Sequence, residues 1–180
     1  ADPWVIFHEG KYYWTFTAAG RGIYVFCSDR LTSLGERHLA WIAPASGAYS
    51  REVWAPELHR LDGQWYIYTT ASDGNNATHR VIVLESETGS PLGPYRFKAE
   101  VYTGDQYGTA DTNHWGIDAT VLEHGGRRYL VWSGWEDDAE AQWLYIAPLL
   151  NPWTVMASRV RLCPNNAHCW EHVGEARTGV

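Results

Sequence analysis

The sequence predicts an all-β chain built from repeated units of antiparallel strands. Its apolar segments are dominated by residue types that favour strands, with 11 Trp and 11 Tyr against a single Met. Runs of alternating apolar and polar residues are separated by tight glycine turns, as in β-hairpins. Three stretches, which begin at Asp2, Ala55 and Asp118, also repeat one spacing of residues. Together these observations indicate a repeat architecture made of short strands.

The repeated spacing joins an initial position to a glycine and then to a tyrosine. A glycine lies eight positions after the start of each stretch, and a tyrosine lies three positions after that glycine. The glycines are Gly10, Gly63 and Gly126, and the tyrosines are Tyr13, Tyr66 and Tyr129. Asp62-Gly63 between two apolar runs is a strong hairpin signal. Each stretch is therefore expected to form two strands joined by a tight turn.

Further strands follow each predicted hairpin. The hairpins pair residues 5–7 with 11–17, 58–61 with 64–70, and 121–122 with 129–132. Third strands are expected at 22–26, 80–84 and 143–147, and fourth, outer strands at 39–42, 97–101 and 160–162. Proline-containing turns at 90–94 and 150–153 separate a third strand from a fourth.

Four strands per unit, repeated around an axis, are typical of a β-propeller blade. A β-sandwich also contains many short strands, but it does not need internal self-similarity of this kind. We interpret residues 1–180 as a partial propeller domain with blades that start near residues 2, 55 and 118. Closure of a propeller takes at least four blades. The remaining blades are therefore expected from a longer protein or from a second chain.

Composition narrows the classes of partner. The formal net charge is −7, so neither a nucleic acid nor an acidic membrane is an expected partner. No apolar run approaches the ~20 residues of a membrane helix. The chain opens abruptly at Asp2-Pro3 without a visible signal peptide, which we interpret as a trimmed or truncated start. Cys163 and Cys169 are either a small loop disulfide or two ordinary thiols.

The first residue of each repeat is the candidate for chemistry. The innermost strands of a propeller line its central channel, so Asp2 and Asp118 are expected to point into one funnel mouth. Ala55 holds the equivalent place in the middle unit and leaves room for a ligand. Two carboxylates across a cavity are the basic equipment of glycoside hydrolysis. The alternative is that each aspartate caps a turn before its strand.

Three motifs carry a resemblance to a known family. The segments 1–5 (Ala-Asp-Pro-Trp-Val), 53–57 (Val-Trp-Ala-Pro-Glu) and 115–119 (Trp-Gly-Ile-Asp-Ala) together resemble glycoside hydrolase family 43. The resemblance spans the whole chain and implies a five-bladed β-propeller of the kind found in arabinan- and xylan-degrading enzymes. The segments 132–136 and 147–153 look most like the exo-acting α-L-arabinofuranosidases of that family.

The resemblance also implies roles for single residues. Asp2 matches the general base that activates water, and Asp118 matches the aspartate that orients the general acid and raises its pKa. The family's acid is a glutamate in an Asn-Glu-Gly-Pro motif, which this sequence lacks. The segment 170–180 resembles the residues just before that motif, so the acid is expected just past Val180. Glu171 and Glu175 lack the right neighbours and are not assigned as the acid.

Several further residues are candidates for substrate binding. Tryptophan provides apolar platforms for sugar rings, although most of the tryptophans must pack the blades. Glu57 is expected either to bond a sugar hydroxyl or to satisfy neighbouring backbone, and His114 is either a channel residue or an ordinary loop histidine. Ile117 and Ser133 match positions near the terminal sugar in the family. The tryptophan candidates are Trp4, Trp54, Trp115 and Trp135.

The sequence therefore predicts an inverting glycosidase that removes terminal α-L-arabinofuranosyl units from arabinan or arabinoxylan. Its rivals are a β-xylosidase or endo-arabinanase on the same scaffold, and a non-catalytic carbohydrate-binding propeller that lacks the acid. The mechanism needs no organic cofactor. Many family members hold calcium or another ion in the channel, but the usual ligands come from later blades, and no metal ligand is identified here. A secreted, extracellular protein is favoured.

Overall fold

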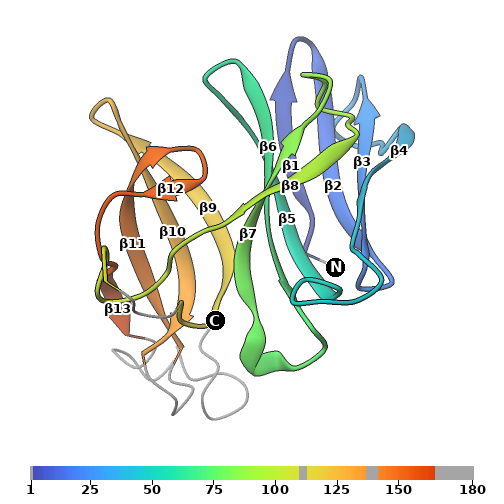
Figure 1. Ribbon diagram of the computed structural model, residues 1–180. Coiled ribbons are helices and arrows are strands. Elements are labelled where there is room, and N and C mark those ends of the chain that lie inside the picture. Colours follow the sequence, from blue (N-terminus) through green and yellow to red (C-terminus); the bar gives the residue numbers. More distant parts are fainter. Residues whose placement is uncertain (1, 110–112, 137–141, 165–180) are drawn as a thin grey trace.

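The computed structural model describes residues 2–109, 113–136 and 142–164, which form three antiparallel sheets (Figure 1). The first sheet contains β1 (Trp4–His8), β2 (Lys11–Ala18), β3 (Gly22–Ser28) and β4 (Glu36–Ile42) in that order. The second contains β5 (Arg51–Leu61), β6 (Gln64–Ser72), β7 (Arg80–Ser86) and β8 (Tyr95–Glu100). The third contains β9 (Gly116–His124), β10 (Arg127–Trp135), β11 (Gln142–Asn151), β12 (Thr154–Val155) and β13 (Val160–Pro164). The all-β prediction of repeated four-stranded units is confirmed.

The three leading hairpins turn in the same way. Both central residues of each turn have positive φ, at 49° and 82° for Glu9-Gly10, 52° and 80° for Asp62-Gly63, and 58° and 73° for Gly125-Gly126. Two consecutive positive φ angles define the type I′ turn, whose twist matches that of the strands it joins. The repeated glycine in the sequence therefore marks the same turn in every sheet.

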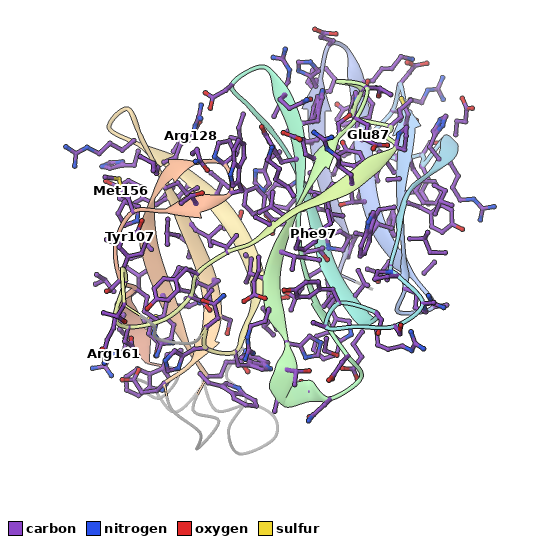
Figure 2. All side chains as sticks on the ribbon, viewed as in Figure 1. Glu87, Phe97, Tyr107, Arg128, Met156 and Arg161 are labelled. Carbon is purple, nitrogen blue, oxygen red and sulfur yellow. The ribbon has the colours of Figure 1, made fainter. Side chains whose placement is uncertain are left out.

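The middle sheet is buried on both faces. From Trp65 to Ser72 every residue of β6 is buried. Because strand side chains alternate between faces, Trp65 and Ile67 pack toward the first sheet, whereas Tyr66 and Tyr68 pack toward the third. Side chains fill the space between neighbouring sheets (Figure 2). The two interfaces are the two hydrophobic cores of the described residues.

Side chains also donate hydrogen bonds from one sheet to the backbone of the next. These donors lie in or beside the cores, where an unpaired carbonyl would be costly. The Trp4 indole donates to the Leu58 carbonyl at 3.0 Å, the Thr15 hydroxyl donates to the Pro56 carbonyl, and the Tyr68 hydroxyl donates to the Pro152 carbonyl. The sheets are thus held in register with one another as well as packed.

The outer edge of the third sheet differs from the expected single strand at 160–162. Two short strands share the long strand β11 there: β13 pairs with residues 143–146, and β12 pairs with Leu149 and Asn151. The chain folds back because the turn at 151–154 is closed by a hydrogen bond from the Trp153 amide to the Asn151 side chain, at 3.0 Å. A run as short as β12 carries too little pattern to be found in the sequence.

Two further features complete the description. The short 3₁₀ helix η1 (Asn76–Thr78) lies between β6 and β7, and no helix of the described ranges is long and apolar enough to cross a membrane. Cys169, Glu171, Glu175 and the rest of the segment 170–180 lie outside the described residues. The proposals that rest on them stay expectations.

We expect Tyr68→Phe to lower the free energy of unfolding by about 1–3 kcal/mol, because the buried Pro152 carbonyl loses its donor while the ring stays. Tyr12→Phe is the matched control. The Tyr12 ring packs on exposed Phe7 at 4.8 Å, so its change should stay within about 0.5 kcal/mol. Urea denaturation of both variants measures the difference. Equal free energies of unfolding would contradict this role for the hydroxyl.

Candidate functional site

The site is built on bulges in the innermost strands of two sheets. The pairing of β5 with β6 shifts register between Trp54 and Glu57, and the pairing of β9 with β10 shifts once, between the pairs Ile117–Ser133 and Thr120–Val131 that flank Asp118. Ala55 and Asp118 lie in these two bulges with φ of 42° and 53°. A bulge re-aims a side chain, and a left-handed non-glycine residue costs of order 1–3 kcal/mol. The two sheets therefore use the same strained backbone at equivalent places.

Two carboxylates act on the charge of Asp118 at this place. Asp2 precedes β1, Asp118 lies in the bulge of β9, and Glu57 follows the bulge of β5; Asp2 and Asp118 are exposed. The Asp118 side chain is exposed, but neighbouring protein atoms partly desolvate its carboxyl and raise its pKa above the usual range, and the carboxylates of Asp2 and Glu57 raise it further. The structure thus places the two predicted catalytic aspartates in one electrostatic cluster and adds Glu57 to it.

Glu57 is held by a histidine that the sequence did not single out. Its Oε2 lies 3.0 Å from Nε2 of His59, and the two side chains are only 18% and 10% exposed. The His59 ring packs 5.1 Å from the ring of Trp4. Since the Trp4 indole N–H bonds to Leu58, Trp4 lies within the contact between the first two sheets. Its role as a sugar platform stays a prediction.

His79 is a second residue that the sequence analysis missed. It is fully buried, with its ring 3.9 Å from the Trp54 ring and 6.4 Å from the Trp115 ring. Its Nδ1 lies 2.9 Å from the Asn76 carbonyl, which also accepts a 2.7 Å hydrogen bond from the Trp115 indole. His79 lowers the pKa of Asp118 and so partly offsets the carboxylates. Its place in a loop, outside any periodic pattern, gave no sign of this contact.

Two tryptophans meet at the ends of β9 and β10. Trp115 and Trp135 stack with ring centroids 4.6 Å apart and planes 10° from parallel. Next to the stack, Gly116 and Gly134 pair across the two strands. A Cβ atom added to Gly116 would lie 3.0 Å from the Trp132 side chain, and one added to Gly134 would lie 3.1 Å from it. Glycine at both positions avoids these tight contacts, and the stacked pair lies directly beyond the point where the two strands pack closely against Trp132.

The remaining predicted residues divide into two places. Ile117 and Ser133 are cross-strand partners beside Asp118, and the Ser133 hydroxyl accepts a 2.7 Å hydrogen bond from the Gln142 amide. His114 lies in the connection before β9, where its Nε2 is 3.4 Å from Asp105. The structure thus brings Ile117 and Ser133 to the bulge and turns His114 toward the loop that follows β8.

Two hollows of the described residues lie away from the bulges. A cavity of about 920 Å³ is lined by residues of the β9–β10 turn together with Asp62 and Met156, at the end of the sheets away from the bulges. A second, of about 490 Å³, is lined by the segment 45–51 and Asp73. Neither contains a predicted site residue, and both lack the grouped carboxylates, so we place the chemistry at the bulges. In the described ranges no group of three or more His, Cys, Asp and Glu side chains could hold a metal ion.

This arrangement suits the chemistry of sugars. When carboxylates lie close together, one of them tends to stay protonated. Catalysis by a general acid and a general base needs such a pair, with one carboxyl protonated and the other ionised. The partly exposed rings of Trp54 and Trp135 offer apolar surface to a hydroxylated ligand, whereas Trp115 is only 6% exposed.

Comparison with known proteins assigns the chain to a family. The model for glycosyl hydrolases family 43 matches residues 1–176. An extracellular exo-α-(1→5)-L-arabinofuranosidase from Streptomyces chartreusis is 33% identical over 97% of this chain and 53% of its own length. An α-L-arabinofuranosidase 43 from Humicola insolens is 34% identical over 97% of this chain and 36% of its own length. The chain spans between about a third and about half of these curated relatives.

Solved structures agree with the sequence comparison. The crystal structure of an α-L-arabinofuranosidase from Lactobacillus brevis superposes with a TM-score of 0.82 and 29% identity, over 95% of this chain and 55% of that one. An endo-arabinase from Bacteroides thetaiotaomicron shares the fold at a TM-score of 0.70 and 19% identity. These relatives are five-bladed propellers, so the predicted blade architecture is confirmed, and the chain belongs to glycosyl hydrolases family 43.

Proposed function

We propose that the protein carrying this chain is an inverting glycosidase that releases terminal α-L-arabinofuranosyl units from arabinan or arabinoxylan. The observation that carries the proposal is the raised pKa of Asp118, which Asp2 and Glu57 crowd beside two aromatic pairs. The curated relatives named above are arabinofuranosidases, which supports the choice of sugar. The names of the Streptomyces relatives also support a secreted protein.

In this proposal Asp2 is the general base. Its carboxylate takes a proton from water as the water oxygen bonds to the anomeric carbon, while the glycosidic bond breaks and the leaving oxygen takes a proton from the acid. Inversion requires the base and the acid to lie about 6.5–9.5 Å apart, which leaves room for the water. The acid is assigned to a glutamate in the family's Asn-Glu-Gly-Pro motif, which is not among these 180 residues.

Asp118 acts on the acid through its charge. A nearby carboxylate disfavours ionisation of a neighbouring acid and so keeps its proton available near neutral pH. In the same way, after the larger effect of desolvation, the carboxylates of Asp2 and Glu57 raise the pKa of Asp118. Trp54 and the stacked Trp115 and Trp135 are proposed to contact the sugar, as are Ile117 and Ser133. No organic cofactor takes part in these steps.

The choice of substrate is tested with a panel. An aryl α-L-arabinofuranoside, an aryl β-xyloside and debranched arabinan distinguish the arabinofuranosidase from the β-xylosidase and the endo-arabinanase, since fold does not fix substrate. Cleavage of the first substrate alone supports the proposal. Cleavage of none, together with binding of arabino-oligosaccharides, would instead favour a carbohydrate-binding propeller.

We expect Asp2→Asn in the whole protein to reduce kcat by about 10²–10⁴-fold, because an amide cannot take the proton from water. Since Asp2 is exposed, the unfolding temperature should hardly change. Asp29→Asn is the matched control, since Asp29 is an exposed carboxylate of the first sheet that pairs with Lys11 at 2.7 Å. Near-normal turnover of Asp2→Asn would show that the base is another group.

We expect Asp118→Asn to raise the unfolding temperature at neutral pH. Because the native state raises the pKa of Asp118, it binds this proton more tightly than the unfolded chain does. The contribution of Asp118 to stability therefore falls as pH rises from the ordinary carboxyl range through the raised pKa, and the asparagine removes this loss. The gain should vanish below about pH 3.9, where the carboxyl is protonated in both states.

The control for this pH profile is Asp62→Asn, which should have the opposite sign. The Arg128 guanidinium lowers the pKa of Asp62, so the ionised Asp62 stabilises the native state above the ordinary carboxyl range. Thermal unfolding from acid to neutral pH measures both variants. A lower unfolding temperature for Asp118→Asn at neutral pH would argue against crowding of the carboxylates.

A further inference from the structure

Arg159 is a buried cation with no part in the chemistry proposed above. It lies just before β13, two residues from Arg161, whose side chain is at the lower edge of the third sheet (Figure 2). The Arg159 side chain is 1% exposed. Its guanidinium carbon lies 4.0 Å from the centre of the Tyr145 ring. A charge buried this deeply needs partners on several sides.

Two of those partners are backbone carbonyls at the end of β10. Nη1 of Arg159 donates to the Trp135 carbonyl at 2.6 Å, and Nη2 donates to the Glu136 carbonyl at 3.3 Å. The Trp135 amide on the other side donates to the Trp115 carbonyl at 3.3 Å. The Tyr145 hydroxyl donates to the Glu136 carboxylate from the same side. The main chain at Trp135 is therefore fixed on both sides.

The third partner is the carboxylate of Asp105. Nε and Nη2 of Arg159 donate to its two oxygens at 2.7 and 3.0 Å, which is the bidentate geometry that favours arginine. Asp105 Oδ2 also lies 3.4 Å from Nε2 of His114, the residue immediately before Trp115. One cation thus reaches the neighbourhood of both stacked tryptophans, directly at Trp135 and through Asp105 at Trp115.

We propose that Arg159 is a positioning residue that holds the Trp115–Trp135 stack in place as a sugar-binding surface beside Asp118. Trp135 carries most of the exposed surface of the stack, since Trp115 is only 6% exposed. The part that concerns the sugar rests on the proposed function, whereas the part that concerns the stack does not. Four donor contacts from one planar guanidinium define the clamp, and only arginine can make them together. Lysine in the same place carries the charge but has no planar fork.

The test compares Arg159→Lys with the unchanged protein in two measurements. Stacked indoles couple their electronic transitions, so the Trp115–Trp135 pair should give an exciton couplet in the circular dichroism spectrum. Arg159→Lys should lose most of this couplet. It should also raise KM for the aryl α-L-arabinofuranoside by roughly 10–100-fold, the order of effect that a misplacement of about 1 Å produces. kcat should change far less, because the partners of Arg159 given above are the Trp135 and Glu136 carbonyls, Asp105 and the Tyr145 ring rather than Asp2 or Asp118.

Two control variants are compared by the same two measurements, the exciton couplet and KM. Trp135→Phe defines the spectrum without the pair. Arg128→Lys removes a comparable fork at the opposite end of β10, where Arg128 binds Asp62 at 2.7 Å and Glu123 at 2.8 Å (Figure 2). It should leave both the couplet and KM unchanged. If Arg159→Lys fails to fold, Asp105→Asn weakens the same clamp and should reduce the couplet in part.

Three results would overturn the proposal. The first is a folded Arg159→Lys variant with an unchanged couplet, or an unchanged couplet in Asp105→Asn. The second is a lost couplet with unchanged KM, which would separate the stack from sugar binding. The third is an equal rise of KM in Arg128→Lys, which would point to a general loss of stability. If the protein cleaves no arabinofuranoside at all, the proposed function fails while the couplet still decides the clamp.

Discussion

The burial of the middle sheet on both faces is the constraint from which the rest of the structure follows. Because β6 packs against both neighbouring sheets, the middle sheet can neither slide nor tilt without opening a core. The hydrogen bonds of Thr15 and Tyr68 to carbonyls of the adjacent sheets fix the remaining freedom. The first strands of the sheets then converge, and this convergence brings Asp2 and Asp118, which are far apart in the sequence, into one electrostatic cluster.

The groups around that cluster are themselves fixed by packing and hydrogen bonds in the scaffold. His59 bonds Glu57 and packs on Trp4, so the contact between the first two sheets also orients a carboxylate of the site. His79 lies under Trp54 and beside Trp115, and it supplies an opposing influence on the pKa of Asp118. These buried polar contacts, together with solvent, therefore offset part of the repulsion among the negative groups.

Most of the fold could be predicted because local chemistry and global packing agree. One type of turn favours the glycine that lies eight positions after Asp2, Ala55 and Asp118. The position of that glycine was therefore enough to predict the repeated hairpin. The register of the β9–β10 hairpin alone would pair Ser133 with Asp118, and only the bulge between Val131 and Ser133 shifts the partner of Ser133 to Ile117. The roles of His59, His79 and Arg159 could not be read in the same way, since their partners are backbone carbonyls and side chains brought together only by tertiary packing. β12 was missed because two residues carry no periodicity.

Ala55 and Asp118 share one backbone conformation, although only the aspartate carries a reactive group. The left-handed bulge therefore belongs to the blade and exists whether or not a reactive side chain occupies it. A repeat unit of this kind can gain or lose an acid by substitution at a single codon without rerouting the main chain. In one unit this position carries the small methyl group of Ala55, and in another it carries the charged carboxylate of Asp118. Duplication of such a unit would let an ancestral scaffold acquire its functional groups one position at a time.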